Sequence, residues 1–481
     1  MPHHNPLPPK QPLRKTKIVA TLGPTSADEK TLSQMLKAGM NVARVNFSHG
    51  DHESNGALID AVRAAAEKSR RPVAVLQDLC GPKIRIGDFA TETVTLKPRK
   101  TFTLTTQKVV GDVSRVSVNY PKLPGEVTKG APILLNDGKV LLRVQKTTAT
   151  DITCQVVTGG TIRGRRGVNA PGAALSISAI TAKDKKDLGF GLEKGVNFVT
   201  LSFVRKAKEV HELRKLLGAQ RDEIGIIAKI ETQEAIEHID AIIEAADGIM
   251  VARGDLAIEI PREEVPLVQK DIITKCNTLG KPVITATQML DSMREQEVPT
   301  RAEVNDVANA ILDGSDAVML SDETTVGRFP AHAVETMAYI AETVEQSEHA
   351  HGMHMQISCV SNTIADSVTA AIAREARVVR ATAIVGFTES GLTTRLIARH
   401  RPQQPILVLT PHEKTYYQAL LVHGCYPVMV APVGTLREAI AESRKALKKL
   451  KLGAKGDRFV LGAGMPFKQQ GSTNMLVVER V

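Results

Sequence analysis

Residues 225–255 read GIIAKIETQEAIEHIDAIIEAADGIMVARGD, in which two short apolar runs flank a stretch with helical spacing. The runs are Gly225–Ile230 and Gly248–Val251, and between them Ile236, Ile239 and Ile243 recur every three or four residues. Short apolar runs of this kind predict buried strands, whereas the isoleucine stripe predicts an amphipathic helix. The segment therefore predicts a strand–helix–strand unit with two parallel strands.

The same alternation recurs along the chain and predicts eight parallel strands. We expect them at Lys17–Leu22, Asn41–Phe47, Val73–Asp78, Asn197–Phe203, Gly225–Ile230, Gly248–Val251, Pro282–Ala286 and Ala317–Leu320. Eight strand–helix units favour a closed (β/α)8 barrel, the TIM-barrel fold, with α/β class overall. The first helix is expected over 26–39, with Ser26 as its N-terminal cap and Gly39 at its end.

About 95 residues between the third and fourth strands lack an amphipathic helix and predict a small inserted all-β domain. Its strands are expected at Thr91–Leu96, Thr101–Thr105, Ser114–Val118, Pro132–Leu135, Val140–Val144 and Ile152–Val157. Pro124-Gly125, Asp137-Gly138 and Gly159-Gly160 mark turns between them.

A second α/β pattern follows HAHGMHMQ (349–356), which we interpret as a linker. Strands are expected at Ala381–Phe387, Ile406–Thr410, Val428–Ala431, Phe459–Gly462 and Met475–Val481, and helices at Asn362–Ala376, Gly391–His400, Tyr416–His423 and Thr435–Leu450. The predicted domains are a barrel of residues 1–82 and 176–347, a β-barrel lid of 83–175, and a C-terminal α/β domain of 348–481. Residues 1–15 are Pro-rich and basic, and are expected to form a flexible tail.

Composition narrows the choice of partners. The formal net charge is +10, but basic and acidic residues are interspersed, aromatic residues make up 3% and Trp is absent. A base-stacking nucleic-acid surface is therefore not expected, and no apolar run reaches the roughly 20 residues that cross a bilayer. Five scattered cysteines without a C-x-x-C pair favour a reducing compartment over a disulfide framework or zinc site. Phosphorylated metabolites are the expected anions.

Polar residues gather where the predicted barrel strands end, which is where active sites lie in this fold. They are Arg44, Asn46, Ser48, Asp78, Ser202, Lys229, Glu231, Arg253, Asp255, Thr287 and Ser321. Charged groups within apolar strands are hard to explain by packing, so we expect them to converge on one mouth of the barrel.

Lys229 and Glu231 are two residues apart in a strand, so their side chains point to the same face. By themselves they could be a structural ion pair or catalytic groups. Asp255 adds a second carboxylate, and two carboxylates with substrate oxygens are a usual way to hold Mg²⁺. Together the three residues favour a magnesium site.

Neither of the two common glycine-rich phosphate-binding motifs occurs in the chain. Arg44, Arg85 and Lys229, with a metal ion, could neutralise a transferring phosphoryl group by position and charge. Gly254 could add a backbone N–H donor, or could simply form a turn.

Four long motifs in the expected order make the chain resemble the pyruvate kinase family from near Lys17 to the C-terminus. They are IVATLGPTS (18–26), MNVARVNFSHG (40–50), IIAKIET (226–232) with IMVARGDLAIEIP (249–261), and TATQMLDSM (285–293). The resemblance implies a cytoplasmic enzyme that transfers the phosphoryl group of phosphoenolpyruvate to ADP, giving ATP and enolpyruvate, which is protonated to pyruvate.

The resemblance also implies the roles of individual residues. Glu231 and Asp255 match the family's Mg²⁺ carboxylates, Lys229 its phosphoryl-stabilising lysine, and Arg44 its phosphate-contacting arginine. Thr287 lies where the family binds substrate carboxylate and relays a proton, and Gly254 and Asp255 belong to the same substrate site.

Further roles follow for the nucleotide and a monovalent cation. The resemblance places Arg85, Arg166, Asn46 and His49 at the nucleotide, which brings a second Mg²⁺, and Asn46, Ser48 and Asp78 in the family's cation pocket. Arg166 stands where many members have lysine.

Two positions depart from the family pattern. Lys83 replaces the Glu of potassium-dependent members, and its tethered ammonium can supply the charge that K⁺ otherwise brings; Leu79, Cys80 and Ile86 also resemble the potassium-independent set. We therefore predict activity without K⁺. Asp322 stands where Gly is usual, and we interpret it as surface variation.

The C-terminal domain resembles the family's regulatory domain. Thr388, Ser390, Gly391 and Thr393, within TESGLTTR (388–395), resemble its loop for a phosphorylated effector, either a sugar phosphate or a nucleotide monophosphate. A capped helix without a ligand is the alternative. A homotetramer is expected from the resemblance.

Two other functions remain possible from the sequence. A different barrel enzyme of phosphoenolpyruvate or pyruvate chemistry could share the Mg²⁺ carboxylates, but it would lack the inserted domain and the MNVARVNFSHG cluster. A catalytically dead metabolite sensor could keep the fold, but the joint presence of Arg44, Lys229, Glu231, Asp255 and Thr287 argues against it.

Overall fold

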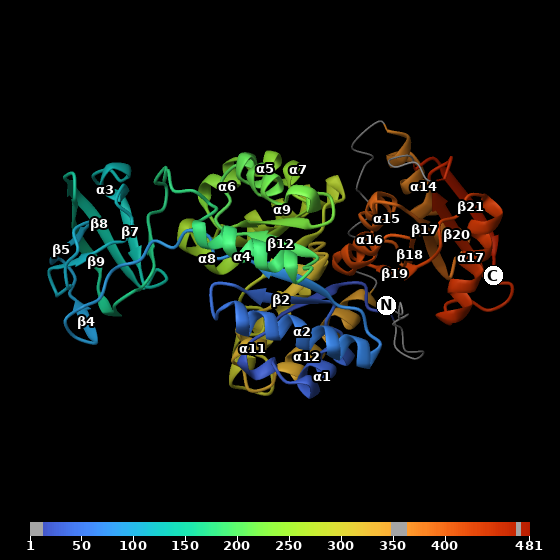
Figure 1. Ribbon diagram of the computed structural model, residues 1–481, viewed down its shortest axis with the longest axis horizontal. Coiled ribbons are helices and arrows are strands. Elements are labelled where there is room, and N and C mark those ends of the chain that lie inside the picture. The colour runs from blue at the N-terminus through green and yellow to red at the C-terminus, as the bar shows by residue number, and fades with distance from the viewer. Residues whose placement is uncertain (1–12, 348–362, 468–472) are drawn as a thin grey trace.

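The computed structural model describes residues 13–347, 363–467 and 473–481. Figure 1 shows three bodies in a row, with the inserted β strands at one end, the barrel in the middle and the C-terminal α/β layers at the other end. The proposed linker at 349–356 lies outside the described residues. Every helix in the described ranges is too short or too polar to span a bilayer.

The barrel is closed and parallel, with strand order β1-β16-β15-β14-β13-β12-β3-β2, which confirms the predicted TIM-barrel fold. All eight strands lie within two residues of their expected ends. They are β1 (Lys17–Thr21), β2 (Val42–Asn46), β3 (Ala74–Asp78), β12 (Phe198–Leu201), β13 (Gly225–Ile230), β14 (Gly248–Ala252), β15 (Val283–Ala286) and β16 (Ala317–Leu320).

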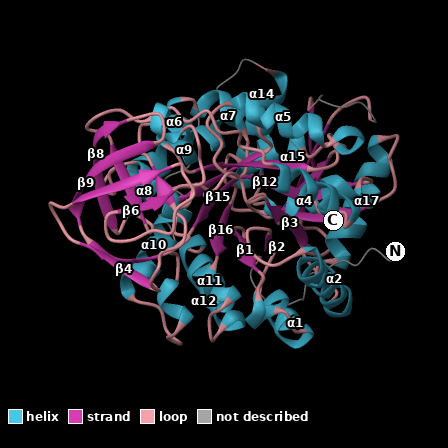
Figure 2. Cartoon of the chain, turned by 60° about the vertical axis from the view of Figure 1, so that its left-hand side comes forward, coloured by secondary structure: helices cyan, strands magenta, loops and turns pink. Residues whose placement is uncertain are grey.

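Helices enclose these strands (Figure 2). They are α1 (Glu29–Ala38), α2 (His52–Ser69), α4 (Ala182–Glu193), α5 (Ala207–Leu216), α6 (Gln233–Glu237), α7 (Ile239–Ala245), α8 (Arg253–Glu259), α9 (Val265–Leu279), α10 (Arg301–Leu312), α11 (Asp322–Thr325) and α12 (Pro330–Glu345). The helix expected between β13 and β14 is therefore split in two, at His238.

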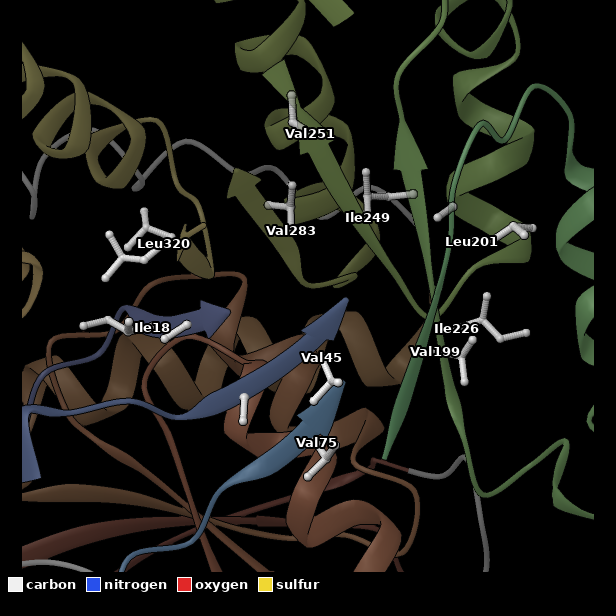
Figure 3. Packing of buried hydrophobic residues seen from close by; sticks show 14 of the residues in the cluster. Ile18, Val45, Val75, Val199, Leu201, Ile226, Ile249, Val251, Val283 and Leu320 are labelled. Carbon is white, nitrogen blue, oxygen red and sulfur yellow. The ribbon is translucent and has the colours of Figure 1, made fainter. Parts of the chain in front are cut away.

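Side chains along each strand alternate between two apolar cores. Ile226 and Ile249 belong to the core between strands and helices, part of which Figure 3 shows, whereas their neighbours Ile227 and Met250 belong to the core inside the barrel. This alternation is the period of two that a strand imposes. Continuing it from Ile227 places the side chain of Lys229 on the inner face, close to the carboxyl end of β13.

The expected cap of the first helix was wrong. Helix α1 begins at Glu29, and the side chain of Asp28 accepts a hydrogen bond from the backbone N–H of Thr31. Ser26 is buried in a preceding 3₁₀ turn (Pro24–Ser26), where its hydroxyl accepts from the N–H of Gly23. Gly39 ends the helix as predicted, with a φ of 119° that favours glycine.

The inserted segment contains all six expected strands. They are β4 (Thr93–Leu96), β5 (Thr101–Thr105), β6 (Arg115–Ser117), β7 (Pro132–Leu135), β8 (Val140–Thr147) and β9 (Asp151–Thr158). Two further short strands, β10 (Gly160–Arg163) and β11 (Val168–Asn169), and the helical turn α3 (Leu123–Glu126) were not predicted. The strands form a six-stranded sheet (β11-β7-β8-β9-β5-β6) and a two-stranded sheet (β10-β4), whereas we expected a single β-barrel.

The C-terminal domain is a five-stranded sheet of order β19-β18-β17-β20-β21, in which only β21 is antiparallel to its neighbour. Its elements are α14 (Ile364–Val378), β17 (Ala383–Phe387), α15 (Leu392–Ala398), β18 (Ile406–Thr410), α16 (Glu413–Gln418), η4 (Ala419–Leu421), β19 (Cys425–Met429), α17 (Leu436–Lys449), β20 (Arg458–Ala463) and β21 (Met475–Arg480). Strand β19 begins three residues before its predicted start and includes Pro427. A proline is tolerated there because β19 is an edge strand.

Buried polar contacts attach this domain to the base of the barrel. Arg401 Nη1 lies 3.0 Å from Asp316 Oδ1, and Arg401 Nη2 donates to Asn277 Oδ1 at 2.6 Å. Lys17 Nζ, also buried, donates to the carbonyl of Cys425 at 2.6 Å. Arg14, which we expected in the flexible tail, donates to Asn41 Oδ1 at 2.6 Å, so the described part of that tail is tied to the barrel.

We predict that Arg401→Met destabilises the protein by about 3–5 kcal/mol, because it leaves Asp316 charged and buried without its partner. Urea unfolding followed by circular dichroism measures the effect. The matched control is Arg444→Met, whose ion pair with Glu479 is only partly buried and is worth about 0–1 kcal/mol. A loss no larger than in the control would contradict the predicted role of Arg401.

Candidate active site

A row of alternating charges lies inside the barrel near the carboxyl ends of its strands. Lys229 Nζ is 2.7 Å from Glu231 Oε1 and 3.8 Å from Asp78 Oδ1, and it donates to Ser202 Oγ at 2.9 Å. The side chains of Asp78 and Glu231 are 2% and 1% exposed, so neither carboxylate can rely on water. The strand period that places Lys229 on the inner face places Glu231 there as well.

Arg44 extends this row on the opposite side of Asp78. Its Nε donates to Asp78 Oδ2 at 2.8 Å, its Nη2 lies 2.5 Å from the same oxygen, and its Nη1 donates to Thr21 Oγ1 at 2.8 Å. Thr200 donates its hydroxyl proton to the other oxygen of Asp78. Asp78 therefore joins the two cations that the sequence assigned to the phosphoryl group.

Burial and neighbouring opposite charges shift the pKa values of the residues in this row in opposite directions. Burial favours the neutral carboxyl of Asp78, but Lys229 and Arg44 outweigh it and hold the pKa below its ordinary value. Burial likewise lowers the pKa of Lys229, yet Asp78, Glu231 and Asp255 raise it above the ordinary value, so Lys229 is a cation at neutral pH. Burial, with Asp255, holds the pKa of Glu231 above its ordinary value even though Lys229 lowers it.

Glu231 and Asp255 are the two carboxylates that could hold a divalent metal. Glu231 Oε2 accepts from the backbone N–H of Phe203 at 2.6 Å, and Asp255 is half-buried in the first turn of α8. No group of three or more His, Cys, Asp or Glu side chains in the described ranges could hold a metal. Two carboxylates nevertheless fit Mg²⁺, which commonly keeps waters and substrate oxygens as its other ligands.

Thr287 follows β15 in a backbone conformation that is rare for a β-branched residue. Its φ is 71°, and the next residue, Gln288, has φ 54°. Thr287 Oγ1 accepts from the N–H of Gly254 at 2.8 Å, and Arg253 Nη2 donates to the Thr287 carbonyl at 2.7 Å. Arg253 is held in turn by Asp306, through two contacts of 2.7 Å. These contacts stabilise the turn and fix the position of the Thr287 hydroxyl.

A cavity of about 570 Å³ separates the barrel mouth from the inserted domain. The inserted side contributes the cations Lys83, Arg85 and Arg166, whereas α8 contributes the carboxylates Asp255 and Glu259. Arg44, Lys229, Glu231 and Thr287 do not line this cavity. Phe203 lines the cavity, and its backbone N–H donates to Glu231, so Glu231 lies directly behind the cavity wall. The site thus has a deep charged row and, beside it, a larger chamber lined by both cations and carboxylates.

Comparison with known proteins agrees with this geometry. The family model "Pyruvate kinase, barrel domain" matches residues 13–334, and "Pyruvate kinase, alpha/beta domain" matches residues 366–479. The chain belongs to the pyruvate kinase family. It is 46% identical over 469 residues to the pyruvate kinase of Geobacillus stearothermophilus, covering 97% of this chain and 80% of that protein. It is 41% identical over 472 residues to that of Clostridium acetobutylicum, covering 98% and 100%.

Membership of the pyruvate kinase family establishes the reaction. The enzyme transfers a phosphoryl group from phosphoenolpyruvate to ADP and releases pyruvate and ATP. Similarity to pyruvate kinases over almost the whole chain decides against a different barrel enzyme and against a dead sensor.

The residues that resemble the family's monovalent-cation pocket lie beside the charged row. Asn46 is opposite Asp78 in the β2–β3 register, and its Oδ1 accepts from the N–H of Ser48 at 3.0 Å. Burial lowers the pKa of the nearby His49, and Lys83, Arg44 and Arg85 lower it further. Lys83 is therefore close enough to contribute positive charge here.

Glu259 is a polar residue of the chamber that sequence reasoning missed. Burial raises its pKa to about 7, and Asn169 Nδ2, from β11 of the inserted segment, donates to it at 3.3 Å. It lies four residues after Asp255 in α8, and this helical spacing is the signal that could have identified it.

The residues that resemble the family's effector loop make hydrogen bonds within the C-terminal domain. Thr388 Oγ1 accepts from the N–H of Gly391 at 2.9 Å, and Thr393 Oγ1 is 2.6 Å from Thr473 Oγ1. Gly391 has a φ of 78°, which permits the tight turn before α15. Ser390 is half-buried beside this turn.

We predict that Asp78→Asn lowers the free energy of unfolding by about 3–5 kcal/mol at pH 7, because it leaves Arg44 and Lys229 without their shared anion. Since the folded pKa of Asp78 is lowered, its stabilising effect is complete above the unfolded pKa and is lost as pH falls through the folded value. The difference between native and variant in urea unfolding should shrink from pH 5 downward. A difference that grows on acidification would contradict this.

We also predict that Arg253→Lys lowers kcat by about 10- to 100-fold with little change in KM, because a lysine cannot hold both Asp306 and the Thr287 carbonyl. Steady-state assays of pyruvate formation measure both constants. Arg262→Lys, an exposed change in the same region, is the control. Equal kcat values in the two variants would contradict the idea that Arg253 positions Thr287.

Proposed function

We propose that this enzyme performs the pyruvate kinase reaction with Lys229 and Arg44 as the cations that neutralise the phosphoryl group in transfer, and without a requirement for K⁺. The contact that carries the proposal is Lys229 held between Asp78 and Glu231, which keeps a buried ammonium charged at the strand ends. A fixed cation in a water-poor site stabilises developing negative charge without reorganising.

Glu231 and Asp255 are proposed to hold Mg²⁺, with a second Mg²⁺ arriving with the nucleotide. When bound, the metal would neutralise phosphate charge and orient the substrate oxygens. Gly254 and Asp255, in the first turn of α8, would bind phosphoenolpyruvate alongside Lys229 and Arg44. Burial raises the pKa values of Glu231 and of the nearby Glu259, which is consistent with anions that need a cationic partner.

The nucleotide is proposed to enter the chamber between the inserted domain and the barrel. Arg85 and Arg166 are exposed on its cationic side, where they can reach ADP phosphates. His49 and Asn46 lie toward the strand ends and would contact the end of ADP that accepts the phosphoryl group. The predicted lid, residues 83–175, would then exclude water from the reaction by closing on the barrel.

Thr287 is proposed to bind the substrate carboxylate and to relay the proton that converts enolpyruvate to pyruvate. The support is its fixed hydroxyl, which contacts the N–H of Gly254 within the same substrate site. Because Arg253 and Gly254 restrain it from both sides, the hydroxyl needs no rearrangement before the proton moves.

Potassium independence is proposed for the pocket of Asn46, Ser48 and Asp78. Burial lowers the pKa of His49, and Lys83, Arg44 and Arg85 lower it further, so these three cations lie close to the pocket. Within the described residues, no carboxylate lies within ion-pair distance of Lys83. Its charge is therefore available to replace a monovalent cation.

The remaining parts of the proposal rest on family membership. They are a cytoplasmic homotetramer, the domain boundaries given above, and regulation by a phosphorylated effector at Thr388, Ser390, Gly391 and Thr393. Sugar phosphate and nucleotide monophosphate both remain candidates for that effector.

We predict that the native enzyme forms pyruvate from phosphoenolpyruvate, ADP and Mg²⁺ in K⁺-free buffer, whereas Lys83→Glu loses at least about tenfold in kcat/KM without K⁺ and regains it when K⁺ is added. A coupled assay in tetramethylammonium salts, with and without K⁺, measures both. Lys146→Glu, an exposed change on the inserted domain, controls for altered charge. Strict dependence of the native enzyme on K⁺ would refute the proposal.

A further inference from the structure

Residues 169–177, which we call the return segment, lead from β11 of the inserted domain back toward α4 of the barrel. Leu175 and Ile177 of this segment line the chamber beside the charged row. The barrel holds the return segment at two points, through the side chains of Arg205 and Glu259. Each of these side chains comes from an element that also positions one of the two carboxylates proposed to hold Mg²⁺.

Arg205 binds two carbonyls of the return segment with a guanidinium that is itself fixed. Its Nη1 donates to the carbonyl of Leu175 and its Nη2 to that of Ile177. Arg205 Nη2 also lies 2.8 Å from Glu209 Oε1, and Glu209 Oε2 accepts from the backbone N–H of Arg205 at 2.7 Å. The two side chains are 13% and 7% exposed, so this ion pair is largely shielded from water. Only the planar fork of an arginine can reach both carbonyls and the carboxylate together.

Arg205 is two residues from a contact with the first metal carboxylate. Phe203 has a φ of 54°, which is unusual for a bulky residue, and in this turn its N–H donates to Glu231 Oε2 at 2.6 Å. Ser202, the preceding residue, accepts from Lys229 Nζ at 2.9 Å. This loop therefore holds Glu231 and Lys229 at one end and the return segment at the other.

Helix α8 makes the second attachment. Its first turn carries Asp255, and its last residue, Glu259, accepts from Asn169 Nδ2 of the return segment at 3.3 Å. Residues four apart lie on the same face of a helix, and both carboxylates line the chamber. The turn between β7 and β8 also lies against this end of α8, because a Cβ at Gly138 would stand 3.9 Å from Ile258 Cγ1. The inserted domain therefore contacts the helix that carries the second metal carboxylate.

We propose that Arg205 and Glu259 are positioning residues through which the return segment controls the affinity of the metal site. This role rests on the proposed function, in which Glu231 and Asp255 hold Mg²⁺. Mg²⁺ demands near-ideal octahedral geometry, so a carboxylate that is displaced with its loop or helix binds the ion less tightly. Groups that orient metal ligands without touching the metal change metal affinity for the same reason.

Coupling of this kind acts in both directions. If the return segment sets the metal affinity, a bound ion must in turn hold the return segment against the barrel, because the coupling free energy between two sites is shared. The backbone N–H groups of residues 169–177 should then exchange with solvent more slowly when metal is present. A purely structural contact would leave the exchange of this segment independent of metal.

Two variants that preserve charge test the role of these contacts. Arg205→Lys keeps a cation beside Glu209, but one ammonium cannot hold both carbonyls of the return segment. Asn169→Ala removes the donor to Glu259. Because neither variant changes the net charge, a change in metal affinity would come from position and not from direct electrostatics. We expect each to weaken Mn²⁺ binding to the full-length, substrate-free enzyme at least about fivefold, measured by electron paramagnetic resonance of free Mn²⁺.

Hydrogen exchange followed by mass spectrometry supplies a second readout. In the native enzyme Mg²⁺ should slow exchange over residues 169–177, and in both variants it should slow exchange less. Arg163→Lys and Thr161→Ala, two exposed changes on β10, are the matched controls, because their side-chain partners lie within the inserted domain. Both controls should bind Mn²⁺ as the native enzyme does.

Asp255→Asn separates failure of the positioning role from failure of the metal site itself. Mn²⁺ binding that is absent in the native enzyme, or unchanged in Asp255→Asn, would overturn the proposed metal site and the positioning role with it. Mn²⁺ binding that is lost in Asp255→Asn but native in both Arg205→Lys and Asn169→Ala would leave the metal site standing and overturn the positioning role alone. Asn169 is half-buried and uncharged, so its variant keeps the test decisive even if Arg205→Lys does not fold.

Discussion

The ion pairs that Asp78 and Glu231 make with Lys229 are the constraint around which the catalytic end of the barrel is organised. Two carboxylates and an ammonium lose almost all contact with water on folding. Burying any one of these charges without the others would cost a large amount of free energy. The result is a lysine that stays charged despite burial and an aspartate that also holds Arg44. A site that must stabilise moving phosphate charge needs cations fixed in this way before the substrate arrives.

Much of this arrangement could be predicted from the sequence because it follows from strand geometry. The spacing of Lys229 and Glu231 placed both on one face of a strand. That this face is the inside of the barrel follows from the structure, in which Ile226 and Ile227 belong to different cores. The exact partners could not be predicted. That Arg44 would bind Asp78, and not only substrate, depends on the register of β2 with β3, which brings residues 34 positions apart into contact. Arg253 was noticed at a strand end, but its role depends on Asp306, which is 53 residues away.

The errors had local causes. Ser26 and Asp28 are both good helix caps, and the choice between them depended on a 3₁₀ turn that buries Ser26. Strands β10 and β11 have four and two residues, too few for an alternating pattern to be read. Glu259 was overlooked because a carboxylate in a helix is ordinary until the inserted segment brings Asn169 to it. Long-range contacts of this kind bring single charged residues together at the carboxyl ends of the barrel strands.

The central claim is that Lys229 supplies the charge that stabilises the phosphoryl group in transfer, and Lys229→Met tests it most directly. The measurement is the rate of pyruvate formation at saturating phosphoenolpyruvate, ADP and Mg²⁺, with circular dichroism to establish that the variant is folded and exposed Lys185→Met as the control. The account predicts a loss of at least about 100-fold in kcat, the size expected when a fixed electrostatic group is removed from a transition state. A folded Lys229→Met enzyme that keeps more than about a tenth of the native rate, a loss of less than about 1.4 kcal/mol, would contradict it.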